Sequence, residues 1–216
     1  MLCSCPTSAT PCPKKTSNAL NAGPNSELPT IDDSSSMKHL TLLCLLGFVA
    51  WTSAAQQFMT RTGNVGFFSA TPIENIEAHN HQMSGLLDSS NGGFAFQVQM
   101  RGFHFEKALM EEHFNENYVE SDTYPKATFQ GTIDGWNNAW NDGETHSVVA
   151  RGTFDIHGVK APHDVEGTLR WNGEAWELSA TFDLTLADHN VVIPAVVKDN
   201  IAPQIEVTVD ATLDPR

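Results

Sequence analysis

The feature that most constrains the fold of this chain is an alternation of apolar and polar side chains that runs through residues 56–216. Two segments, 177–186 and 204–213, alternate almost without exception. Successive side chains of a β-strand point to opposite faces, so each segment predicts a strand with one buried and one wet face. Such strands are typical of antiparallel sheets, because both faces of a parallel sheet are covered.

Six further segments show the same alternation more loosely, namely residues 64–68, 76–87, 94–100, 127–133, 148–156 and 165–171. Turn sequences separate several of them: Asn91-Gly92-Gly93, Asn141-Asp142-Gly143 and Asn172-Gly173. The sequence therefore predicts about eight antiparallel strands. They either close into a barrel, which leaves no long exposed edge, or stack as a sandwich.

Residues 105–119 break the alternation. Their apolar side chains recur at a spacing near 3.6 residues, which places them on one face of a helix and the glutamates on the other faces. This spacing predicts an amphipathic helix between two strands. We expect it to end before Ser121, with Pro125 returning the chain to an extended conformation.

The chain before residue 56 has a different composition. Residues 1–36 are polar, hold few apolar side chains and are expected to be disordered. Residues 37–55 read as a secretory signal peptide, with Lys38, an apolar run and the small Ser53-Ala54-Ala55. We predict cleavage before Gln56, a periplasmic or secreted barrel domain over 56–216, and Met37 as the true start.

Charge and cysteine content exclude several function classes. The formal net charge is −14, from 12 basic and 26 acidic residues, which disfavours nucleic acid as a partner. The apolar run of residues 40–51 is too short for a membrane span. All four cysteines precede residue 56, so the predicted domain holds neither a disulfide nor a thiolate site.

Motifs for catalysis and metal binding are weak. His79 and His81 lie on one face of a predicted strand, but two imidazoles do not make a metal site, and solvent-facing histidines are the better interpretation. No nucleophile elbow, phosphate-binding loop or dinucleotide fingerprint appears. His157 is interpreted as a turn residue rather than a base. We therefore predict no catalytic residue, no metal and no cofactor, apart from a bound lipid.

Small side chains fall on the apolar faces: Ala127, Gly131, Ala150, Gly152, Gly167, Ala180 and Ala211. An eight-stranded barrel is wide enough for a packed core or one small ligand. Small inward side chains favour a ligand-sized space, and the ligand would be apolar. The alternative is that aromatic side chains from across the barrel fill these gaps.

Three blocks of sequence, in order, resemble the YceI-like family of exported lipid- and polyisoprenoid-binding proteins. The blocks are residues 103–133 with Tyr124-Pro125-Lys126-Ala127-Thr128-Phe129, residues 150–165 with the run from Gly152 to Lys160, and the two closing strands joined through 193–202. The resemblance implies a lipocalin-like barrel of eight antiparallel strands with a helical segment near one mouth. It also implies a hydrophobic tunnel for a long isoprenoid or similar lipid, and no catalysis.

The expected function is thus the binding of an apolar or amphiphilic molecule, with a filled structural or envelope-stress interaction domain as the alternative. The helix is either a gate or a plug. The oligomeric state stays open, a homodimer included. The residues expected to contact the lipid are Phe96, Val98, Met100, Phe129, Phe154, Phe182 and Leu184 from the strands, and Leu109, Phe114 and Tyr118 from the helix.

Overall fold

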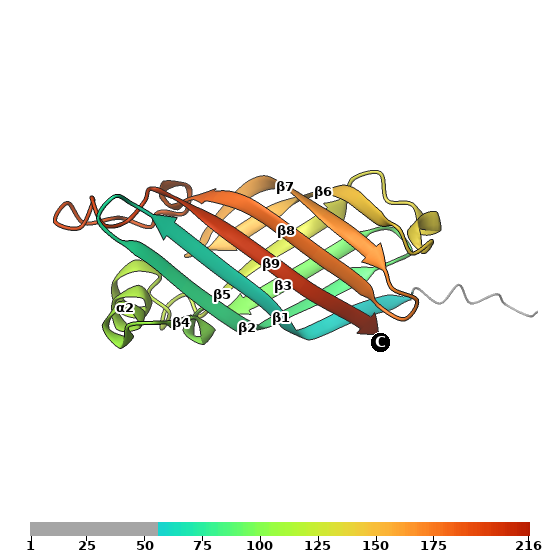
Figure 1. The fold of residues 1–216 in the computed structure, drawn as a ribbon, viewed down its shortest axis with the longest axis horizontal. Helices are drawn as coiled ribbons and strands as arrows, with labels where there is room; N and C mark the ends of the chain where they lie inside the picture. The colour runs from blue at the N-terminus through green and yellow to red at the C-terminus, as the bar shows by residue number, and fades with distance from the viewer. Residues whose placement is uncertain (1–55) are drawn as a thin grey trace, which may run out of the picture. The chain divides into compact units, whose positions relative to one another are not determined.

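Eight long antiparallel strands form a closed barrel in the computed structural model, which describes residues 56–216 (Figure 1). The order around the barrel is β1-β9-β8-β7-β6-β5-β3-β2, and β2 pairs with β1 to close it. The strands are β1 (Gln57–Ala70), β2 (Asn75–Asp88), β3 (Gly93–Gln99), β5 (Lys126–Ile133), β6 (Thr145–Ile156), β7 (Val159–Trp171), β8 (Trp176–Thr185) and β9 (Gln204–Pro215). The barrel prediction is confirmed, and the sandwich is wrong.

The first strand is longer than the sequence indicated. β1 begins at Gln57 rather than near residue 64. Its pairing with β2 shifts register between Thr60 and Gly63 and again before Val65. A bulge puts one extra residue on one strand, so the alternation changes phase there. The alternation of apolar and polar side chains can therefore be recognised in the sequence only beyond these bulges.

The predicted turns are confirmed. Gly92, Gly143 and Gly173 all have positive φ, at +73°, +85° and +102°, a region that residues with a Cβ rarely occupy. At Gly92 a side chain is also excluded by contact, because a Cβ there would lie 2.6 Å from Trp136 Cβ.

The predicted helix is shorter than expected and starts later. Phe105 belongs to the two-residue strand β4 (His104–Phe105), where it pairs with Ala78 of β2. Helix α2 (Ala108–His113) follows and continues as the π-helix η2 (Phe114–Tyr118), which ends before Ser121 as predicted. Three short 3₁₀ helices complete the structure: η1 (Met100–Gly102), η3 (Asn138–Trp140) and η4 (Leu186–His189).

The two ends of the barrel are built differently. The connections at residues 71–74, 100–125, 157–158 and 186–203 gather at one end, called here the mouth (Figure 1). The other end, the closed end, is filled by one apolar cluster that Trp136, Trp140 and Trp171 extend. The buried members of this cluster are Phe58, Leu87, Phe94, Ile133, Val148, Leu169, Trp176 and Leu213. A second buried apolar cluster lies toward the mouth, formed by Val65, Ala78, Met83, Met100, Phe103, Val119, Ile205, Val207 and Ala211.

The predictions for the leader lie outside the described residues. These are the disordered segment 1–36, the signal peptide 37–55, the cleavage before Gln56 and the start at Met37. Within residues 56–216, no helix has the length and apolar character needed to cross a membrane.

Candidate ligand-binding cavity

An apolar cavity of about 410 Å³ lies inside the barrel. It begins above closed-end residues such as Ile133 and Leu213 and reaches Met110 of α2 and Ile201 of the 186–203 loop at the mouth. Its volume falls within the range of small-molecule pockets, about 300 to 1,000 Å³. The barrel therefore encloses an apolar space that extends from the closed end to the mouth.

The small inward residues divide into two groups. Ala127, Ala150, Gly167 and Ala180 line the cavity and leave space, as expected. Gly131, Gly152 and Ala211 do not. Gly131 pairs with Gly152, and a Cβ on Gly152 would lie 2.7 Å from Phe129 Cε2, so that ring covers the glycine. Ala211 is buried in the core. These three positions therefore leave no space, although the ring over Gly152 comes from the neighbouring strand β5 and not from across the barrel.

Aromatic rings make much of the cavity wall. Phe129 stacks on Phe154 with ring centroids 4.2 Å apart, and Phe154 stacks on Phe182 at 5.6 Å. Nearer the mouth, Phe67 packs against Phe103 and Phe114, which also contact each other. Such a wall can hold a hydrocarbon chain by burial and dispersion, and it offers few polar groups to orient a reacting one.

Nine of the ten residues predicted to contact a ligand line this one cavity: Phe96, Val98, Met100, Phe114, Tyr118, Phe129, Phe154, Phe182 and Leu184. Leu109 does not, because its side chain lies on the outside and is 61% exposed. The predicted helix counted its phase from Phe105, which belongs to β4, whereas Met110 is the residue of α2 that reaches the cavity. Contact of these residues with a ligand stays a prediction.

Sequence reasoning missed the part of the wall contributed by β1 and β2, for example Val65, Phe67 and Met83. The bulges in β1 obscure its alternation. Phe103 was also missed, because it lies between the periodic segments, and Phe105 was missed because it was assigned to the helix, whereas it belongs to β4.

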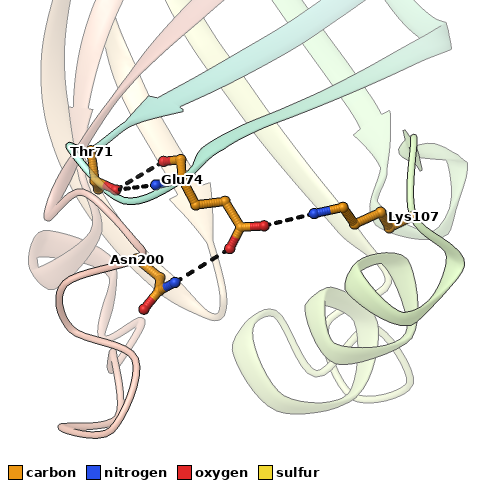
Figure 2. Close-up of polar contacts among 4 residues, drawn as sticks. All are labelled: Thr71, Glu74, Lys107 and Asn200. Carbon is orange, nitrogen blue, oxygen red and sulfur yellow. Dashed lines mark hydrogen bonds and ion pairs between the residues drawn. The ribbon is translucent and has the colours of Figure 1, made fainter.

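Glu74 joins three mouth segments (Figure 2). Its Oε1 accepts a 2.8 Å hydrogen bond from Lys107 Nζ, next to α2, and its Oε2 accepts one of 3.4 Å from Asn200 Nδ2 in the 186–203 loop. The hydrogen bond from Lys107 is the main reason why the pKa of Glu74 lies below its ordinary value. We call Glu74, Lys107 and Asn200 the Glu74 clip.

His157 makes a second connection across the mouth. Its Nδ1 donates to the backbone carbonyl of His189 at 3.2 Å, and its Nε2 lies 3.2 Å from Glu120 Oε2. Glu120, His157 and Asn190 are the non-glycine residues with positive φ in the described chain. His157 is therefore a turn residue, as predicted, and this side of the mouth is held in a costly backbone conformation.

The remaining titratable groups do not converge. His79 and His81 are exposed on the outer wall, where their rings stack 6.5 Å apart. Within residues 56–216 no group of three or more His, Cys, Asp or Glu side chains could hold a metal ion. His189 lines the cavity, and burial is the main reason why its pKa lies below the ordinary value. The arrangement suits binding by apolar contact.

Comparisons with known proteins agree with this geometry. A family model described as a YceI-like domain matches residues 49–213. A polyisoprenoid binding domain from Saccharophagus degradans, implicated in plant cell wall breakdown, superposes with a TM-score of 0.65 at 16% identity, over 74% of this chain and 98% of that domain. BcnA of Burkholderia cenocepacia gives 0.58 at 17% identity, over 70% and 95%. These two structures support the barrel fold. No curated protein sequence matches the chain.

Proposed function

Because the chain belongs to the YceI-like family, we propose that it binds a polyisoprenoid or a similar long apolar lipid inside its barrel. The observation that carries this proposal is the 410 Å³ cavity with its wall of aromatic and aliphatic side chains. The solved domain from Saccharophagus degradans, which shares the fold, is a polyisoprenoid binding domain, and this supports the ligand class.

Hydrophobic transfer provides the affinity. At about 25 cal/mol per Å², a ligand that buries roughly 400 Å² of apolar surface gains about 10 kcal/mol before the entropy of association is subtracted. Micromolar affinity or better follows. Selectivity would come from chain length and width, since the wall offers few hydrogen-bonding partners.

The proposed role is to hold or carry the lipid without catalysis, in the periplasm or outside the cell. The predicted signal peptide at residues 37–55 supports export. The mostly apolar wall supports the absence of chemistry, because general acid–base catalysis needs polar groups placed at a reacting atom. A long isoprenoid is poorly soluble in water, so a closed apolar container is a physical means of moving it through an aqueous compartment.

The test is an organic extract of the protein purified from its native host, analysed by mass spectrometry. We expect a long-chain apolar lipid in near-stoichiometric amount, with its class and chain length read from the same spectrum. An extract without lipid, from protein never exposed to detergent, would contradict the proposal and favour the structural or envelope-stress interaction domain.

A separate prediction concerns the Glu74 clip. Replacing Glu74 with Ala removes the partner of both Lys107 and Asn200, so the mouth segments move more freely and a fluorescent isoprenoid probe should leave roughly two- to five-fold faster. Stopped-flow dilution measures this rate. Glu77→Ala, an exposed carboxylate on β2, is the matched control.

The same clip predicts a pH dependence with a definite sign. The lowered pKa of Glu74 means that the clip is complete above the ordinary carboxyl range and is lost as the pH falls through the lowered value. Probe release from the native protein should therefore accelerate in acid toward the rate of Glu74→Ala. A release rate that rises equally in acid for Glu74→Ala would contradict this assignment.

A further inference from the structure

The exposed apolar side chains of this protein are gathered at one place. Among residues 56–216, four large hydrophobic residues are exposed: Ile73 at 64%, Leu109 at 61%, Val192 at 75% and Val196 at 90%. All four belong to the mouth, in the β1–β2 turn, in α2 and in the 186–203 loop. Single exposed hydrophobic residues need no explanation, but four at one end of a barrel do.

The Glu74 clip shows that these three segments lie beside one another. Figure 2 shows Glu74 bound to Lys107 and to Asn200. In the sequence, Ile73 directly precedes Glu74, Leu109 is two residues from Lys107, and Val196 is four residues from Asn200. The cavity reaches this same end, where Met110, Val197 and Ile201 line it. The exposed residues thus lie at the end of the barrel that the cavity reaches, where a ligand would enter. We call Ile73, Leu109, Val192 and Val196 the mouth rim.

The charges around the mouth rim are mostly acidic. Lys107 is paired with Glu74, and Lys198 is followed by Asp199. The mouth segments also carry Glu106, Glu111, Glu112, Glu116, Glu120 and Asp188, together with Arg101 paired to Asp122, His104 paired to Glu111 and the exposed His113. The chain as a whole carries −14. Such a surface is repelled by anionic lipid, whereas apolar side chains insert into any lipid interface.

We propose that the mouth rim docks onto the surface of a lipid bilayer with zwitterionic headgroups, so that the ligand moves between bilayer and cavity without crossing water. This inference rests on the proposed function. It explains why the apolar side chains lie at the mouth and not on the barrel wall. The docking is weak and reversible, because four aliphatic side chains bury little area compared with a membrane-spanning segment.

Vesicle flotation tests the docking. The full chain, expressed with its own leader, is mixed with phosphatidylcholine vesicles or with vesicles of phosphatidylcholine and phosphatidylglycerol. We expect the wild-type protein to float with the first and less with the second. A variant with Ile73→Ser, Leu109→Ser, Val192→Ser and Val196→Ser should bind at least about ten-fold more weakly. The matched control has Thr→Ser at the exposed Thr145, Thr181, Thr208 and Thr212 of the outer wall.

Binding of a fluorescent farnesyl-chain probe in vesicle-free solution separates the two proposals. The mouth-rim variant should bind the probe like the wild-type protein, because none of its four positions lines the cavity. Wild-type protein that binds the probe but does not float, or a mouth-rim variant that floats like wild type, overturns the docking alone. Failure to bind the probe is a failure of the proposed function itself.

Two other results would also overturn the docking. Preferential flotation with the anionic vesicles would show that charge, and not the mouth rim, drives the contact. Sedimentation velocity could show that the wild-type protein is a dimer and the mouth-rim variant a monomer. The partner of this surface would then be a second copy of the chain.

Discussion

An Ala180→Phe variant should bind isoprenoid ligands roughly 50- to 100-fold more weakly than the wild-type protein. Ala180 lies on β8 and faces the cavity. A phenyl ring placed there occupies the volume that the ligand would take and removes about 100 Å² of the ligand's apolar contact. At about 25 cal/mol per Å² this is ~2.5 kcal/mol of binding free energy. Titration of a fluorescent isoprenoid probe measures the loss.

The same substitution should leave the fold intact or make it slightly more stable, because the ring fills empty space instead of displacing packed atoms. Thr181→Phe, at the next position and on the exposed outer face, is the matched control and should bind the probe normally. If Ala180→Phe bound the ligand as tightly as Thr181→Phe, the site would have to lie outside the barrel.

The barrel could be predicted because the sequence patterns that specify it lie within single strands and turns. One-faced alternation recurs in each strand, and the glycine turns lie where the strands reverse. The exception is β1, where the register shifts after Thr60 and Gly63 break the alternation. Gly131 and Gly152 were also misinterpreted. Their small size in the sequence predicts free space, but a neighbouring ring and close backbone contacts occupy that space.

The site was predicted well on the strands and poorly at the mouth. In a strand, every second side chain points to the same face, so Phe129, Phe154 and Phe182 could be assigned to the interior of the barrel. A helical residue's face depends on where the helix starts, and the two-residue strand β4 moved that start beyond Phe105. As a result, Leu109 points outward.

The contacts of the Glu74 clip could not be predicted at all. Glu74 and Lys107 are 33 residues apart, and Glu74 and Asn200 are 126 apart. No periodic pattern brings such residues together, and each is an ordinary surface side chain in the sequence. Only the closure of the barrel, which places the connections 71–74, 100–125 and 186–203 at one end, makes these contacts visible.

The barrel divides stability and binding between fully buried side chains and side chains that face the cavity. The fully buried Leu169 and Leu213 belong to the closed end, whereas the side chains along the cavity, such as Phe182 and Leu184, remain partly exposed to the open interior. A side chain that faces empty space has fewer atoms in contact and contributes less to folding. The cavity therefore reduces packing along its wall, and the fully buried side chains of the two apolar clusters supply most of the core.

This separation predicts opposite effects of two truncations. Leu169→Ala should lower the free energy of unfolding by about 3 kcal/mol and the melting temperature by about 6 to 12 °C, with little change in probe binding, because Leu169 is buried away from the cavity. Phe182→Ala should cost about 1 kcal/mol of stability or less but weaken probe binding about five- to ten-fold, since its ring would contact the ligand.

Urea unfolding and probe titration on the same two variants measure both quantities. Leu213→Ala, at the closed end but with its side chain at the base of the cavity, should lose stability like Leu169→Ala and affect only ligands long enough to reach it. If Phe182→Ala proved as destabilising as Leu169→Ala, the ring at 182 would be part of a solid core. The open interior, on which the proposed lipid site depends, would then be wrong.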